Sequence, residues 1–135
     1  MLETEGKCVL IVEDNPLNMK LFGAMVAAQG FGVLQATNGP RGLSMAHQHR
    51  PDLIIMDVNL PGMSGLEVTQ ALKADEETRD IPIIVTTAYG LRGDDPAIRA
   101  SGCDGFMAKP IAISEFLDVV ECLMMRSLHR RLTAL

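Results

Sequence analysis

The sequence predicts a three-layer α/β fold, in which helices cover both faces of a five-stranded parallel sheet. Short apolar runs alternate with amphipathic stretches about five times along the 135 residues. The apolar runs hold β-branched or aromatic residues and little polar alternation, as strands buried on both faces do. Strand–helix alternation with short connections gives a parallel sheet covered by helices.

The predicted strands are the apolar runs themselves. They are Cys8–Val12, Phe31–Ala36, Leu53–Met56, Ile81–Val85 and Gly105–Ala108. No linker, internal repeat or low-complexity tract interrupts this pattern. The length suits one domain, so we expect residues 1–135 to form a single unit, with a core over about residues 7–125 and a basic tail over residues 126–135.

The first predicted helix lies between the first two strands. Asn15 followed by Pro16 is typical of an N-cap with proline at the first helical position, and Gly30 supplies a stop. The i, i+4 spacing predicts a core-facing side made of Leu17, Leu21, Met25 and Ala28.

Four more helices complete the pattern. They are predicted at Pro40–Arg50, at Leu66–Ala74, from Asp94–Asp95–Pro96 to Gly102, and from Ser114–Glu115 onward. The last has an apolar side made of Phe116, Leu117, Val120, Leu123 and Met124. Residues 126–135 keep leucines at helical spacing, so they could extend it.

Composition excludes several classes of protein. The formal net charge of −5 argues against nucleic acid as a main partner, because phosphate backbones attract basic patches. No apolar run approaches the roughly 20 residues that span a bilayer, so no membrane partner is expected. The polar, acidic N-terminus lacks the features of a secretory signal, and the three cysteines form no CxxC pair. We therefore expect a cytoplasmic protein with reduced thiols.

Polar residues follow several predicted strands, at the edge where ligands bind to an open parallel sheet. Glu13 and Asp14 follow the first strand, Asp57 the third, Thr86 and Thr87 the fourth, and Lys109 the fifth. Three carboxylates, a hydroxyl and an ammonium are therefore predicted to converge there.

This set of groups suits phosphoryl chemistry. Clustered carboxylates repel one another, and a bound cation relieves the repulsion. Oxygen ligands at a partly hydrated site favour Mg²⁺. With the metal bound, an ionised Asp57 can attack phosphorus while the metal and Lys109 neutralise the phosphoryl oxygens. The sequence contains neither GxxxxGK[ST] nor GxGxxG, so the phosphate must come from a donor that is already activated.

Four segments of the chain resemble response-regulator receiver domains of two-component signalling. They are VLIVEDNPLNMKLF (Val9–Phe22), PDLIIMDVNLPGMSGLEV (Pro51–Val68), TTA (Thr86–Ala88) and FMAKP (Phe106–Pro110). The resemblance covers about residues 7–125 and implies a flavodoxin-like sheet of order 2-1-3-4-5. Within the family, the segments NPLNMKLF and SGLEVTQALK are most similar to those of a stand-alone cell-division receiver.

The resemblance assigns a role to each carboxylate. It makes Asp57 the phosphoacceptor, modified by the phosphohistidine of a sensor histidine kinase or of a histidine phosphotransfer protein. It implies that Glu13 and Asp14 hold Mg²⁺ together with Asp57, directly or through water. The backbone carbonyl of Asn59 is a further implied ligand.

The resemblance also implies how the signal leaves the site. Thr87 binds the phosphoryl group and moves toward it, and Lys109 pairs with the carboxylate and then with the phosphate. The Lys109–Pro110 peptide is implied to be cis. Phe106 matches the family's rotating aromatic switch, although it could simply be core. The implied output surface for a downstream protein is the face of the fourth helix, fifth strand and fifth helix.

Two side chains are implied to set the lifetime of the acyl phosphate. Asn59 and Tyr89 lie two residues beyond Asp57 and Thr87, at positions that tune hydrolysis in the family. Bulky Tyr89 is expected to restrict attacking water. Mechanistically, the chain is expected to be a phosphoacceptor signalling protein and not an enzyme.

Two alternatives remain open at the level of sequence. An aspartyl-nucleophile phosphohydrolase needs a second carboxylate two residues after the nucleophile, where this chain has Asn59. An unphosphorylated scaffold is the other alternative, and it is disfavoured by the intact set of Asp57, Lys109 and the acidic pair. From the residues alone, Thr86 and Thr87 are equally plausible hydroxyls, and the family register selects Thr87.

Overall fold

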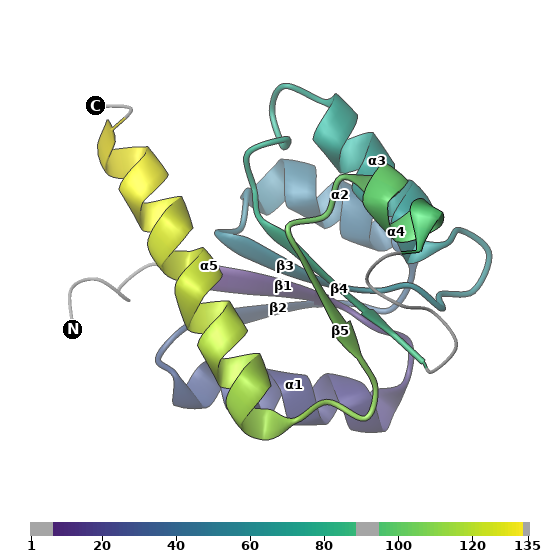
Figure 1. Cartoon of the computed structure of the whole chain (residues 1–135), viewed down its shortest axis with the longest axis horizontal. Coiled ribbons are helices and arrows are strands. Elements are labelled where there is room, and N and C mark those ends of the chain that lie inside the picture. Colours follow the sequence, from purple (N-terminus) through teal and green to yellow (C-terminus); the bar gives the residue numbers. More distant parts are fainter. Residues whose placement is uncertain (1–6, 89–94, 134–135) are drawn as a thin grey trace.

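The computed structural model describes residues 7–88 and 95–133, with residues 128–133 described by their backbone alone. Within these residues, strands and helices alternate along the chain (Figure 1). The strands are β1 (Cys8–Val12), β2 (Gly32–Ala36), β3 (Leu53–Asp57), β4 (Ile83–Thr87) and β5 (Gly105–Ala108). The helices are α1 (Pro16–Ala28), α2 (Gly39–His49), α3 (Gly65–Ala74), α4 (Pro96–Ser101) and α5 (Ile113–Thr133).

The sheet is parallel throughout and has the order β2-β1-β3-β4-β5, which confirms the predicted fold. Side chains of one strand alternate between the two faces. One face packs against α2, α3 and α4, and the other packs against α1 and α5 (Figure 1). Helices on both faces make the central strands β1, β3 and β4 almost wholly buried.

Several boundaries differ from the prediction. The fourth strand begins at Ile83 instead of Ile81, because Pro82 has no N–H for the sheet and stands just before the ladder starts. The third strand includes Asp57. The second helix ends at His49, and Arg50 adopts a left-handed conformation as its C-cap (φ 45°). The fifth helix continues through the basic segment to Thr133.

The prediction for the buried side of α1 was wrong for Leu17, Leu21 and Ala28, which are exposed, and only Met25 of that set packs against the core. Leu17 is 75% exposed and Leu21 is 45% exposed. The buried side chains are Met19, Phe22 and Val26, at i, i+3 and i+7. This helix has apolar residues on several sides, so more than one helical spacing matched the sequence. Packing against the sheet and α5 selects the face, and the rings of Phe22 and Phe116 stack with centroids 5.4 Å apart.

A charged cluster joins several elements at the amino ends of β4 and β5. Lys73 of α3 donates hydrogen bonds to Asp104 Oδ2 (2.7 Å) and to the carbonyls of Ile81 (2.8 Å) and Arg79 (3.0 Å). Asp104 Oδ2 also accepts a bond from the backbone of Ile83. Arg126 of α5 lies 3.6 Å from the other carboxylate oxygen. We call these charged residues, Lys73, Asp104 and Arg126, the amino-end cluster.

Candidate phosphoacceptor site

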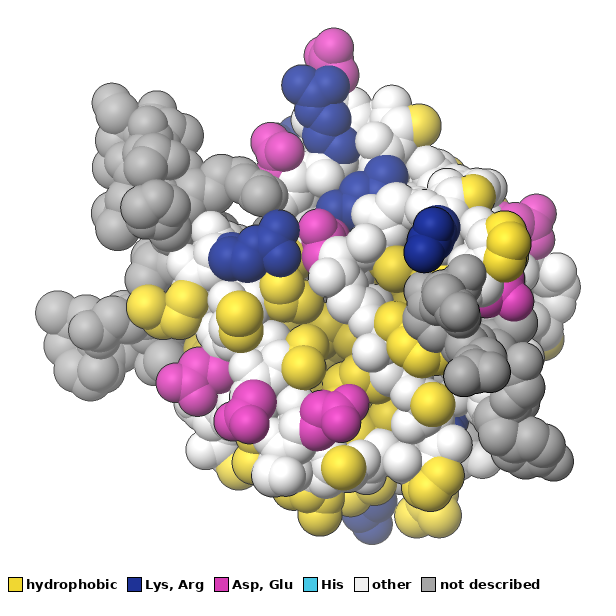
Figure 2. All heavy atoms as spheres, in the orientation of Figure 1, with side chains coloured by type: hydrophobic (Ala, Val, Ile, Leu, Met, Phe, Trp, Pro, Cys, Tyr) yellow, Lys and Arg dark blue, Asp and Glu magenta, His cyan; other side chains and the backbone are white. Residues whose placement is uncertain are grey.

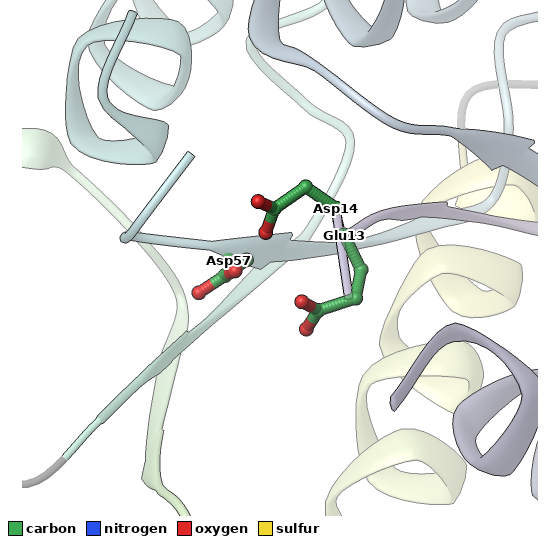
Figure 3. Close-up of side chains that lie close together, drawn as sticks. All are labelled: Glu13, Asp14 and Asp57. Atoms are coloured by element: carbon green, nitrogen blue, oxygen red, sulfur yellow. The ribbon is translucent and has the colours of Figure 1, made fainter. Parts of the chain in front are cut away.

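The carboxylates predicted at the strand ends lie together at the carboxyl edge of the sheet. In the register of β1 and β3, Val12 pairs with Met56, so Glu13 and Asp57 follow as neighbours. Oxygen atoms of Glu13, Asp14 and Asp57 all lie within 4.8 Å of one another (Figure 3). Glu13 and Asp57 are buried, whereas Asp14 is exposed. The three form an acidic triad that opens to solvent on the side of Asp14.

Lys109 brings a positive charge into this triad. Its Nζ donates a hydrogen bond to Glu13 Oε1 at 2.9 Å and lies 3.3 Å from Asp57 Oδ1. The backbone N–H of Lys109 donates to the Thr87 carbonyl at 2.7 Å, which fixes where the side chain starts. The following peptide bond, Lys109–Pro110, is cis, in agreement with the expectation. One ammonium therefore faces three carboxylates.

The pKa of Glu13 is shifted mainly by its burial. Burial raises the pKa of Glu13 above its usual value, the hydrogen bond from Lys109 opposes that rise, and the nearby charge of Asp57 adds to it. Glu13 Oε2 also accepts a hydrogen bond from the Asn15 backbone at 3.2 Å. Because α1 begins at Pro16, directly after Asn15, the dipole at its N-terminus favours a negative charge on Glu13.

Helix α3 approaches Asp57 from the other side, and glycine makes this approach possible. A Cβ at Gly65 would lie 1.9 Å from the backbone oxygen of Asp57. The helix start is set by a capping box, in which Leu66 N–H donates to Ser64 Oγ and Ser64 N–H donates to Glu67 Oε1. Sequence reasoning gave Gly65 and Ser64 no role, although S-x-x-E shortly after Asp57 signals this cap.

The loop after β3 contacts the end of β4 through Asn59. The Asn59 backbone N–H donates to Asp57 Oδ1 at 3.1 Å. Its side-chain oxygen accepts a weaker bond from the Ala88 N–H at 3.3 Å. The Thr87 hydroxyl is buried and donates to the Ala88 carbonyl at 3.1 Å, so it does not bond the carboxylates here. Asn59 thus links Asp57 to Ala88, the residue that follows Thr87.

Two other predicted residues have different outcomes. Phe106 lies in β5, is half-buried and packs against the core under α2, α3 and α4. This position is compatible with both readings made from the sequence, the plain core residue and the switch. Tyr89 lies outside the described residues.

The donor set suits a hard divalent cation. Three carboxylates offer only oxygen ligands, and one ammonium does not balance their charge. Mg²⁺ prefers oxygen ligands and keeps several waters, which the exposed side of Asp14 allows. The backbone carbonyl of Asn59 belongs to the loop that directly follows Asp57 and is the further ligand predicted from the sequence.

A family model described as "Response regulator receiver domain" matches residues 9–121. Among curated proteins, the chain is 48% identical to the polar-differentiation response regulator DivK of Brucella anthropi over 115 residues, covering 85% of this chain and 94% of the relative. It is 47% identical to DivK of Brucella ovis over the same lengths.

Solved structures give the same likeness. The receiver domain of the sensor histidine kinase PA1611 from Pseudomonas aeruginosa, solved with a magnesium ion in its active-site cleft, is 33% identical with a TM-score of 0.80, covering 88% of this chain and 98% of that one. The receiver domain of a histidine kinase from Syntrophus aciditrophicus is 29% identical with a TM-score of 0.83, covering 89% and 91%. Among the described residues, the helices are too short or too polar to cross a membrane.

Proposed function

This chain belongs to the response regulator receiver domain family, and we propose that it works as a stand-alone response regulator whose phosphoacceptor is Asp57. The observation that supports Asp57 best is its position in the acidic triad. Its carboxylate is buried between a second carboxylate and the ammonium of Lys109, yet it lies beside an exposed edge. A purely structural aspartate at the end of a buried strand would need a cationic partner, but not two more carboxylates beside it.

The proposed reaction is transfer of a phosphoryl group from a phosphohistidine. An Asp57 carboxylate oxygen forms the new O–P bond, the P–N bond breaks, and its electron pair stays on the imidazole nitrogen. Charge then resides on the phosphoryl oxygens. Lys109 lies close enough to Asp57 to neutralise part of it, and the Asn59 N–H already points at Asp57 Oδ1.

Mg²⁺ is the proposed cofactor, held by Glu13, Asp14, Asp57 and the Asn59 carbonyl. When bound, it supplies positive charge that stabilises the phosphoryl oxygens. The acidic triad itself supports this assignment, because three carboxylates lie together and the ammonium of Lys109 pairs with two of them. The magnesium-containing relative from Pseudomonas aeruginosa supports it by analogy.

The proposed partner is a sensor histidine kinase or a histidine phosphotransfer protein. Leu17 and Leu21 are exposed on α1, which begins beside the triad. An apolar strip next to the phosphoacceptor offers contact area to a helix that presents the phosphohistidine. A cytoplasmic location is part of this proposal, since the partner's phosphohistidine must be accessible.

Signalling is proposed to follow from movement of Thr87 and Phe106. Thr87 would give up its bond to the Ala88 carbonyl, turn toward the phosphoryl group and leave space for Phe106. Tyr89 and Asn59 would limit access of hydrolytic water. The face of α4, β5 and α5 would then change its affinity for a downstream protein. The likeness to DivK proteins supports a role in cell-division control.

Mass spectrometry after incubation with acetyl phosphate and Mg²⁺ tests the proposal. We expect one phosphoryl group per chain, lost in Asp57→Asn and lost when the metal is chelated. Turnover of a phosphate ester would instead indicate a phosphohydrolase. No labelling of the folded wild-type protein would indicate an unphosphorylated scaffold.

A further inference from the structure

Strand β4 carries a hydroxyl next to the site, that of Thr86, which has no role in the proposed reaction. Thr86 of β4 pairs with Asp57 of β3 on one side and with Met107 of β5 on the other. Paired residues of neighbouring parallel strands point to the same face of the sheet, so Thr86 shares the face of Asp57. Its side chain is wholly buried, and no described residue places a donor or acceptor within hydrogen-bonding distance of Oγ1.

A buried hydroxyl without a partner destabilises the fold. Valine has nearly the same shape and would fill this position without that cost. The other described buried threonines use their hydroxyls: Thr69 donates to the Gly65 carbonyl, Thr78 to the Leu72 carbonyl and Thr87 to the Ala88 carbonyl. Thr86 stands apart from them, and it stands beside the phosphoacceptor.

The path of the Lys109 side chain brings an ammonium close to this hydroxyl. Lys109 directly follows β5, which is an edge strand. Its Nζ nevertheless reaches Asp57 at the end of β3 and Glu13 just beyond β1. Because β4 lies between β5 and β3, the side chain crosses the strand that carries Thr86.

We propose that Thr86 is a positioning residue for Lys109, whose ammonium donates a hydrogen bond to Thr86 Oγ1 once a cation or phosphoryl group occupies the oxygens of Glu13 and Asp57. In the structure these two carboxylates are the partners of the ammonium. A divalent cation on the same oxygens repels the ammonium and removes its acceptors. The ammonium has three hydrogens and must find oxygens elsewhere.

Thr86 Oγ1 can be this acceptor, because Thr86 lies on β4, the strand that the Lys109 side chain crosses. The bond would keep the ammonium near Asp57 instead of releasing it to solvent, ready to meet the phosphoryl oxygens. The hydroxyl would therefore accept no hydrogen bond in the metal-free protein and would accept one from Lys109 when the site is occupied. This inference rests on the proposed function, since it needs the cation site at the acidic triad.

Three variants separate this role from a structural one. Thr86→Val removes the hydroxyl and keeps the shape, and Thr86→Ser keeps the hydroxyl. Thr78→Val is the control, because Thr78 is equally buried but has a bonded hydroxyl. The probes are Mg²⁺ alone, titrated into unphosphorylated protein by calorimetry, and the thermal midpoint of the metal-free protein.

We expect Thr86→Val to raise the metal-free midpoint and to weaken Mg²⁺ binding about tenfold, the value of one hydrogen bond to a charged group. Thr86→Ser should bind Mg²⁺ like the wild type. Thr78→Val should lower the midpoint without changing the Mg²⁺ affinity.

An unchanged Mg²⁺ affinity in Thr86→Val, equal losses in the valine and serine variants, or no Mg²⁺ binding by the wild type would each overturn the inference. Labelling of wild-type Asp57 by acetyl phosphate is measured separately and reports on the proposed function alone. Loss of the Thr86 effect with labelling intact would therefore refute only the role of Thr86.

Discussion

Two lysines bind carboxylates at opposite ends of the sheet, and the two arrangements differ in charge balance. In the amino-end cluster, Lys73 and Arg126 serve one carboxylate, Asp104, and Lys73 bonds two carbonyls as well. At the carboxyl edge, Lys109 alone among the described residues forms ion pairs with the triad, and it pairs with two of the three carboxylates, Glu13 and Asp57. Figure 2 shows one face of the molecule, on which acidic and basic side chains are interspersed.

This contrast distinguishes a structural ion pair from a binding site. A partly buried charge is stable where its partners saturate it, as Asp104 is saturated. The triad has more negative than positive charge, so it is expected to bind a cation. The same pair of residue types therefore stabilises the fold at one end and, in the proposed function, takes part in phosphoryl transfer at the other.

Removing the lysine of the site should give the largest effect. In Lys109→Met, we expect labelling of Asp57 by acetyl phosphate to slow by about 100-fold, as when one preorganised donor to a developing charge is lost. Glu13 and Asp57 would also repel each other without a cation between them. Mg²⁺ should therefore restore more stability to Lys109→Met than to the wild type in urea titrations. A stability deficit that ignores Mg²⁺ would contradict the proposed imbalance.

Removing the lysine of the amino-end cluster should do the opposite. In Lys73→Met, the Asp104 carboxylate and two carbonyls lose their donor, and we expect unfolding free energy to fall by about 2 kcal/mol. The value lies at the lower end for buried pairs, because the Lys73 and Asp104 side chains are 16% and 19% exposed. Labelling of the folded variant should keep the wild-type rate and metal dependence. A metal-dependent recovery of stability would erase the distinction between the two ends.

The smallest effect concerns pH. Because the pKa of Glu13 is raised in the folded protein, the folded state binds this proton more readily than the unfolded state does. Its contribution to stability is full below the unfolded value, near 4.5, and is lost as pH rises through the folded pKa. Urea titrations of metal-free protein should show this loss in the wild type and a flatter profile in Glu13→Gln. Mg²⁺ affinity should fall in the same range as pH is lowered, since the metal competes with the proton.

Much of the fold could be predicted because its signals are local. The strand runs, the Asn15–Pro16 start and the proline and glycine stops all act within a few residues. The buried face of α1 could not, because Leu17 and Phe22 are both apolar and only packing against the sheet and α5 chooses between them. Leu17 and Leu21 of the predicted face were therefore exposed.

Part of the site could also be predicted from the sequence, and part could not. The rule that ligands gather at the carboxyl ends of parallel strands was enough to bring Glu13, Asp57 and Lys109 together. The amino-end cluster was not foreseen, because Lys73 and Asp104 are 31 residues apart and belong to no motif. The lack of a partner at Thr86 is likewise a three-dimensional fact, since strand spacing alone does not show which hydroxyls are satisfied.

The length of α5 has a mechanical consequence. The last buried side chain described on this helix is Met124, and the backbone continues helical to Thr133, past the edge of the sheet (Figure 1). Arg126 still contacts Asp104, and the seven helical residues after it add about 10 Å of rigid rod. A tilt of about 10° where the helix packs would move the far end of this segment by about 2 Å. A small rearrangement at the sheet would therefore produce a larger displacement at the end of α5, which could change its contacts with another molecule.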